Sequence, residues 1–239
     1  MYSFQAVVRK ASNNTINQFE RLGYVGNSMA NMNTTGYKSE RFEQLLDTDG
    51  YLKGAVRTDM SQGSMRITKS PYDVALSGPG YIPVISPSGE VAFTRDGQFK
   101  QGKDGYLLTN DDWMVGDGIK IPTNCHKFVV KPNGEVIVYD EAGSANYRKI
   151  GNIPVVRFDC PEGLIQAGMN KMKPTEESGE PKLLKDHDLL VQHNIETSNT
   201  NVIGNVNEML RLNASMIASM RMIKVVDDMY NKAINIREG

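Results

Sequence analysis

The sequence is poor in cysteine. Its 239 residues include two, Cys125 and Cys160, which form no CxxC pair and have no spacing typical of a zinc site. Free thiols are the favoured interpretation, and a disulfide that closes the loop between them is the alternative. An Asp-Thr-Asp-Gly stretch at residues 47–50 resembles the start of a calcium loop but lacks the ligands that should follow. We therefore expect neither a metal site nor a cofactor.

An excess of charge of one sign is also absent. The chain has 27 Lys and Arg residues against 28 Asp and Glu residues, a net charge of −1, so we expect no nucleic-acid-binding surface. No apolar run is long enough to span a bilayer, and the first ten residues lead into no apolar segment with a small-residue cleavage site. We expect no cleaved Sec-type signal peptide. The protein would stay in the cytoplasm or leave it by a route that removes nothing.

Recognisable catalytic motifs are missing as well. The sequence contains no GxSxG, HExxH, Walker or complete GxGxxG pattern. His126, His187 and His193 fall in turn or loop contexts, and we interpret them as surface residues. Asp111 and Asp112 are adjacent, so on a strand they would point to opposite faces and form no carboxylate pair. The sequence therefore predicts a binding or structural protein without catalytic residues or a small-molecule substrate.

A long amphipathic helix near the C-terminus is the clearest pattern present. Between residues 194 and 236, apolar residues recur every seven positions, with companions four residues further on and a second row beside them. This is an a/d seam over several heptads, wider than a two-stranded coil would bury. Asn213 and Asp227 occupy seam positions where polar residues tend to fix helix register. The predicted interface comprises Val202, Val206, Met209, Leu210, Asn213, Met216, Ile217, Met220, Ile223, Asp227 and Tyr230.

Such a wide apolar stripe needs a partner, because a helix gains most of its stability from packing. Two alternatives remain open: the helix folds back onto the core of its own chain, or it joins copies of the chain. A second, weaker amphipathic helix covers residues 1–33, and its many asparagines mean that it should form mainly when packed. The two helices are natural partners. The predicted interface residues of the first helix are Phe4, Val8, Ala11, Leu22 and Met29.

Between the helices the pattern changes to that of β structure. Residues 34–70 have no sustained periodicity and predict an extended linker with short strands. Residues 71–193 contain short β-branched and aromatic runs separated by Asn-Gly, Asp-Gly and Ser-Gly turns, and two of these turns nearly repeat each other. The C-terminal helix segment follows at 194–239, with Ser198, Asn199 or Thr200 as the expected N-cap. The predicted fold is α+β, with paired terminal helices and a central, mostly antiparallel β domain.

Four stretches of the sequence together resemble the bacterial flagellar rod and hook family. Residues 30–38 (Ala-Asn-Met-Asn-Thr-Thr-Gly-Tyr-Lys) are similar to its N-terminal signature, and residues 70–81 to its Asp-Val-Ala segment with a Gly-x-Gly-aromatic step. Residues 93–99 (Phe-Thr-Arg-Asp-Gly-Gln-Phe) are similar to a family hairpin. Residues 195–202 are similar to the entry into the terminal helix. These stretches, in this order and spacing, span nearly the whole chain. The single β domain and the length are similar to those of the rod proteins and unlike those of the larger hook protein, and residues 161–165 (Pro-Glu-Gly-Leu-Ile) followed by Gly168 are most similar to the distal-rod subgroup.

The resemblance implies a non-enzymatic, structural subunit of the flagellar basal-body rod. Such a subunit would join its terminal helices with those of other copies into a helical tube, the drive shaft of the flagellum. The implied partners are the chain itself, adjacent rod and hook proteins and the flagellar export apparatus, and the implied location is the periplasmic rod, reached without cleavage. A proximal-rod or hook-type axial protein is the alternative within the family. A cell-wall-associated enzyme is the alternative from another class.

Overall fold

The chain passes back and forth between two units. A computed structural model describes residues 4–141, 146–185 and 187–235; the side chains of residues 4, 5, 233 and 234 are not described. One unit, here called the helical unit, comprises residues 1–31, 39–59 and 200–239, and the β unit comprises residues 32–38 and 60–199. The chain therefore crosses from one unit to the other four times.

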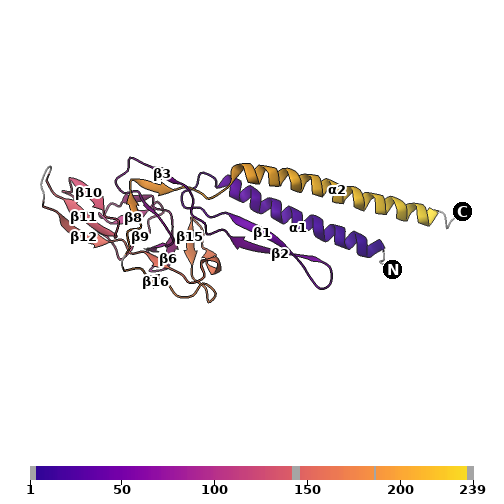
Figure 1. Cartoon of the computed structure of the whole chain (residues 1–239), viewed down its shortest axis with the longest axis horizontal. Coiled ribbons are helices and arrows are strands. Elements are labelled where there is room, and N and C mark those ends of the chain that lie inside the picture. The colour runs from indigo at the N-terminus through magenta and orange to yellow at the C-terminus, as the bar shows by residue number, and fades with distance from the viewer. Residues whose placement is uncertain (1–3, 142–145, 186, 236–239) are drawn as a thin grey trace. The chain divides into compact units, whose positions relative to one another are not determined.

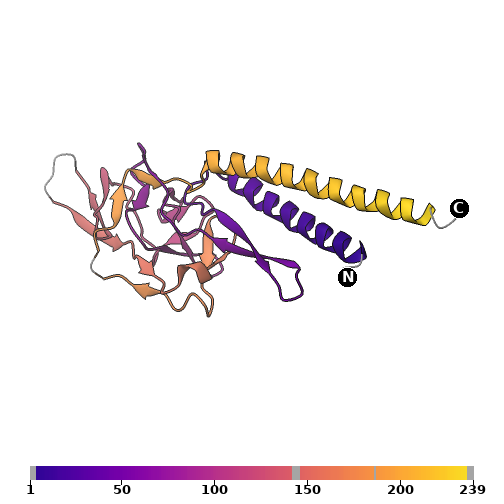
Figure 2. The same ribbon diagram turned by 45° about the vertical axis from the view of Figure 1, so that its right-hand side comes forward.

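The helical unit contains two long helices side by side. α1 (Phe4–Ala30) and α2 (Val202–Asn235) run in opposite directions (Figure 1, Figure 2), which confirms the predicted pair of terminal helices. The N-cap of α2 is Asn201, whose Oδ1 atom accepts the N–H of Gly204 at 3.0 Å. The cap predicted at residues 198–200 is wrong, because strand pairing and the bond from Thr197 N–H to Ser64 O keep the preceding chain extended.

A β-hairpin packs against α1 in the same unit. It consists of β1 (Glu40–Leu46) and β2 (Leu52–Thr58), which pair antiparallel. The side chain of Asn13 accepts the Leu52 N–H at 2.8 Å and donates to the Leu52 carbonyl at 3.1 Å, and Asn17 donates to the same carbonyl. The rings of Tyr24 and Phe42 stack with their centroids 5.7 Å apart. The asparagines that lower the helix propensity of α1 thus bind the backbone of a neighbouring strand.

The β unit is built from short strands whose pairings, among the residues described, are all antiparallel. Its largest sheet has the order β14-β15-β6-β5-β9-β8-β7, and smaller sheets have the orders β10-β11-β12, β13-β16, β17-β4 and β18-β3. This arrangement confirms the α+β fold class. The strands are β3 (Met65–Ile67), β4 (Val74–Leu76), β5 (Ile82–Ile85), β6 (Val91–Thr94), β7 (Phe99–Gln101), β8 (Leu107–Thr109), β9 (Met114–Val115), β10 (Lys127–Val130), β11 (Glu135–Tyr139), β12 (Arg148–Asn152), β13 (Val156–Arg157), β14 (Ile165–Gln166), β15 (Lys171–Lys173), β16 (Lys182–Leu183), β17 (Leu190–Gln192) and β18 (Asn194–Glu196). A short 3-10 helix, η1 (Pro161–Gly163), lies between β13 and β14.

The two nearly identical turn sequences form hairpins of the same design. In the β5–β6 turn, Gly89 has φ +87° and its N–H donates to Ser86 O at 2.9 Å. In the β10–β11 turn, Gly134 has φ +91° and its N–H donates to Lys131 O at 2.9 Å. Both glycines adopt the left-handed conformation that such turns need. The repetition in the sequence therefore predicts a repetition in structure, and the prediction is confirmed.

The core of the β unit has two parts. The larger contains aliphatic residues from β4, β5, β8 and β9 together with residues from β10 and β11, such as Leu107 and Val136, both without solvent exposure. The smaller is aromatic: the ring of Phe158 makes edge contacts with Tyr81 and Phe93, at centroid distances of 5.7 and 5.0 Å. Burial on this scale gives the β unit a core of its own, independent of the helices.

Candidate assembly interface

The face of α2 that packs against α1 follows the heptad pattern only in part. In one row of the predicted seam, Met209, Met216 and Ile223 are buried or half-buried, whereas the two ends of that row, Val202 and Tyr230, are exposed. Polar contacts flank them: Gln18 donates to Ser215 Oγ at 2.7 Å, and Arg21 lies 2.5 Å from the carboxylate of Glu208. Spacings of three and four residues alternate along this face, as expected for two helices packed lengthwise. The inward residues of α2 are Met209, Leu212, Met216, Ser219, Ile223 and Val226.

The companion row that faces α1 lies three residues after the first row, not four. Leu212, Ser219 and Val226 point inward, while the predicted companions, four residues on, are exposed. Both rows carry apolar residues, and a helix with two apolar flanks can present either of them to one neighbour. The described monomer leaves Val206, Asn213, Met220 and Asp227 on the outside. Their role in an assembly stays a prediction.

A second apolar row of α2 lies fully on the outside of the helix pair. We call Ile203, Leu210 and Ile217, which are 77%, 64% and 51% exposed, the outer row. They recur every seven residues and so lie along one line of the helix. Large exposed aliphatic side chains gathered in this way are typical of a surface for contact with other molecules. Further exposed apolar residues of α2 are Val202, Val206, Met220, Met222, Val225, Met229 and Tyr230.

The first helix contributes less apolar surface than the sequence predicts. Val8, Ala11, Leu22 and Met29 are half-buried, and the side chain of Phe4 lies outside the described residues. The residues of α1 that are most buried are polar, namely Asn17, Gln18 and Ser28. Ile16 and Phe19, which the predicted interface does not include, are exposed by 57% and 50%. Polar contacts also hold the inner face of α1, because Asn17 donates to Leu52 O of the hairpin and Gln18 to Ser215 Oγ of α2.

An open groove of about 640 Å³ lies between the distal parts of the two helices. Its lining includes the apolar residues Val8 of α1 and Ile223, Val226 and Tyr230 of α2, and the charged residues Arg9, Lys224 and Asp227. The structure brings five predicted interface residues together here. They are Val8, Met220, Ile223, Asp227 and Tyr230.

In the β unit, three charged side chains meet without access to solvent. Lys38, Arg95 and Glu196 are exposed by 1%, 5% and 0%. Lys38 Nζ lies 2.6 Å from one carboxylate oxygen of Glu196, and Arg95 Nε donates to the other at 2.8 Å. Buried charges persist only when they are paired and hydrogen-bonded, and these are. We call this group the Lys38–Arg95–Glu196 cluster.

Backbone groups complete the bonding of this cluster. Lys38 also donates to Ser61 O at 2.5 Å, and the Gly63 N–H donates to Glu196 at 2.9 Å. The Arg95 guanidinium donates to the carbonyls of Gly80 and Gly78, at 2.7 and 3.0 Å. Burial raises the pKa of the neighbouring Tyr81 to about 12. All four stretches that carry the family resemblance therefore contribute to one site, although they are far apart in sequence.

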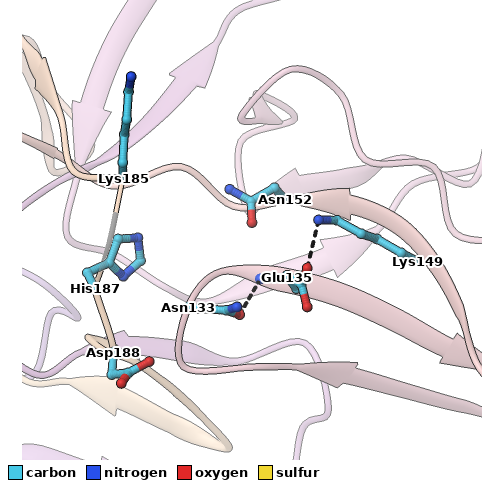
Figure 3. A pocket seen from close by; sticks show the side chains of 7 residues that line it. All are labelled: Asn133, Glu135, Lys149, Asn152, Lys185, His187 and Asp188. Carbon is cyan, nitrogen blue, oxygen red and sulfur yellow. Dashed lines mark hydrogen bonds and ion pairs between the residues drawn. The ribbon is translucent and has the colours of Figure 1, made fainter.

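A polar groove of about 650 Å³ opens elsewhere in the β unit (Figure 3). His187 lies half-buried in it, so its interpretation as a simple surface residue is incomplete; His126 and His193 are exposed, as expected. Hydrogen bonds from Lys149 and Lys131 lower the pKa of Glu135 to about 2. A carboxylate held in its ionised form is a poor proton donor. The groove is lined by Asn133, Glu135, Lys149, Asn152, Lys185, His187 and Asp188.

Three further expectations concern the cysteines, membrane-spanning helices and metal ligands among the described residues. Cys125 and Cys160 are both free, which confirms the free-thiol interpretation. Neither α1 nor α2, over its described length, is both long and apolar enough to cross a membrane. Within the described ranges, no three His, Cys, Asp or Glu side chains gather closely enough to hold a metal ion.

Comparison with known proteins identifies the family. A sequence model described as "Flagellar hook protein FlgE/F/G D1 domain" matches residues 75–138. The chain is 31% identical to a flagellar basal-body rod protein FlgG of Buchnera aphidicola subsp. Schizaphis graminum, over 88% of this chain and 92% of that protein. The chain belongs to the flagellar basal-body rod protein family. It is also 28% identical to the FlgG protein of Caulobacter vibrioides, over 96% and 98% of the two chains, and 25% identical to that of Bacillus subtilis, over 91% and 93%.

Within the rod protein family, the matched domain and the candidate interface occupy different parts of the chain. The domain match begins in β4 and ends in β11, inside the β unit. The exposed apolar residues of α1 and α2 lie outside it. The relatives cover both parts, because their similarity extends over about nine-tenths of the chain or more. The family therefore shares the helical segments as well as the β unit.

Proposed function

We propose that this chain is a structural subunit of the flagellar basal-body rod that assembles with its own copies through α1 and α2. The observation that carries the proposal is the outer row, a line of exposed aliphatic residues on a helix whose opposite side is already occupied by α1. Adjacent rod and hook proteins are the further partners, the rod in the periplasm is the location, and the flagellar export apparatus is the route. No catalytic role is part of the proposal.

The positions of the outer row and of the groove favour an open assembly. The outer row occupies the first half of α2, whereas the groove lined by Ile223, Val226 and Tyr230 lies in its second half. A protruding surface that fits a hollow at a different place on the next copy makes a head-to-tail contact, and such contacts produce filaments unless the rotation closes a ring. The outer row of one subunit would enter the groove of the next.

Mixing two variants tests this arrangement. Leu210→Asp places a charge on the outer row, and Tyr230→Asp places one in the groove; both positions are exposed in the monomer, so each variant should fold. Alone, each should fail to sediment at concentrations where the parent protein forms polymers visible by electron microscopy. Mixed, they should form heterodimers and nothing longer, because each retains one intact surface.

Conservative variants provide the controls. Leu210→Met and Tyr230→Phe keep the apolar character and should polymerise like the parent. If the concentrated parent protein remains monomeric with its helices formed, the proposed function fails. If the parent polymerises but the two aspartate variants also polymerise, or do not combine when mixed, assembly uses other surfaces.

A further inference from the structure

The Lys38–Arg95–Glu196 cluster lies where the chain passes between its two units. The chain leaves the β unit after residue 38 and after residue 199, and it enters the β unit again at residue 60. Lys38 donates to Ser61 O, close to the crossing at residue 60, and to Glu196, close to the crossing after residue 199. Asn199 adds bonds from its N–H to Tyr37 O and from its side chain to Ser61 O. Three crossing points are thus tied together inside the β unit.

The helix pair has little apolar burial of its own. Among the described residues of α1 and α2, the only apolar side chains that are fully buried are Leu212 and Met216. Half-buried apolar residues such as Ile223 add to this burial, and several further contacts are polar, such as Gln18 with Ser215 and Asn14 with Ser219. Polar contacts exchange water for protein partners and give a small net gain. The pair therefore depends on something that holds the two helices near each other.

Chain connectivity alone does not hold them. Lys38 and Glu196 are 158 positions apart in sequence. Because the probability of closing a flexible loop falls with about the 3/2 power of its length, bringing such distant positions together by chance is on the order of 10³-fold less probable than for adjacent ones. Once the folded β unit fixes these positions, the pairing of α1 with α2 becomes a local event at high effective concentration.

We infer that the Lys38–Arg95–Glu196 cluster positions the terminal helices: by tying the crossing points together, it makes the pairing of α1 with α2 possible. The inference concerns the monomer and does not need the proposed function. Only the expected loss of assembly in the cluster variants rests on that function. If α2 is not paired with α1, its outer row has no fixed position from which to contact another copy.

The composition of the cluster indicates which variant separates positioning from folding. The cluster has two cations for one carboxylate, so Lys38→Met leaves Arg95 and Glu196 as a balanced pair that still bonds to Gly78 and Gly80. The β unit should remain folded while the crossing after residue 38 loses the bonds from Lys38 to Ser61 O and to Glu196. Glu196→Asp is the second variant, because its shorter side chain keeps the charge but cannot reach Lys38, Arg95 and the Gly63 N–H together.

Spin labels on the helices measure the pairing directly. Ile16 of α1 and Ile217 of α2 are exposed, and cysteines placed there, with Cys125 and Cys160 changed to serine, accept the labels. The distance distribution in dilute monomer should be short and narrow in the parent. In both cluster variants the paired fraction should fall about tenfold or more. The fluorescence of Trp113, the single tryptophan and a residue of the β unit, should remain that of the parent.

Leu107→Ala is the matched control. It opens a cavity in the core of the β unit and lowers its melting temperature without touching a crossing point. The label distances should not change. The inference is overturned if either cluster variant keeps the parent's distances while Trp113 reports a folded β unit. It is overturned as well if Leu107→Ala separates the helices as much as the cluster variants do.

Discussion

Two neighbouring residues of α2 should have opposite roles, and replacing each with alanine tests the division between the inner and outer faces. Met216 is 7% exposed and packs against α1, whereas Ile217 is 51% exposed on the outer row. Met216→Ala should destabilise the helix pair by about 2–5 kcal/mol, the usual cost of removing a large buried side chain, with the lower end expected where neighbours can relax. Ile217→Ala should change monomer stability by no more than about 0.5 kcal/mol.

The effect of Ile217→Ala should appear on assembly. Complete burial of an isoleucine side chain gains about 1.5–3 kcal/mol, so covering the exposed half gains about 1 kcal/mol, and close packing raises this to about 2 kcal/mol. A loss of 1–2 kcal/mol per subunit raises the critical concentration for polymerisation about 5- to 30-fold. Sedimentation over a range of concentrations gives this value, and circular dichroism melting gives the stability of the helices. The reasoning fails if Ile217→Ala polymerises at the parent's critical concentration or melts like Met216→Ala.

Three further predictions concern charge, proteolysis and pH. Met220→Asp, on the exposed side of α2, should block sedimentation of polymer and leave the helix pair intact, whereas Met216→Asp should also lower the helical signal of the monomer, because it buries a charge without a partner. Limited proteolysis of a chain truncated after Asn199 should leave a core of about residues 60–199 that retains the β signal, and truncation after Asn194, which removes Glu196, should not. Burial raises the pKa of Asp96 to about 6, whereas the same group in the unfolded chain releases its proton near pH 4, so the stability of the β unit falls as pH rises between these values. Asp96→Asn removes this ionisation and should stabilise the β unit at pH 7 by up to about 3 kcal/mol. Urea unfolding at pH 4 and pH 7 should show that the variant has lost the fall in stability.

The local patterns of the sequence predicted the elements, because each depends on near neighbours in the chain. Glycine turns with alternating β-branched runs gave the hairpins around residues 86–90 and 131–134, and the heptads gave α2. Periodicity could not decide which apolar flank of α2 faces α1. Leu212 and Asn213 lie three and four residues after Met209, and either spacing fits a helical seam. Only the contact with α1 shows that Leu212 is the one that is buried.

Contacts between distant residues were beyond the reach of pattern reasoning. Nothing near Lys38 in the sequence indicates that it pairs with Glu196, and a lysine in a polar turn predicts a solvated residue. The resemblance singled out the four stretches but not their meeting point. For residues 34–70 the sequence predicts an extended linker with short strands but not the pairing of β1 with β2, because the asparagine face of α1 that binds this hairpin has polar atoms where a core would have apolar ones.

Two glycines of the motif stretches limit how the chain can vary over evolutionary time. A Cβ atom on Gly36, which has φ +69°, would lie 2.6 Å from the backbone nitrogen of Asp96, and one on Gly97 would overlap the carbonyl of Val74. In both places the Cβ atom would clash with backbone atoms, and no substitution of the neighbouring residue can make its backbone smaller. A cavity in the core can be refilled by a second substitution, but these contacts admit no compensating pair. We expect any side chain that arises at position 36 or 97 to be eliminated in the lineages that carry this fold.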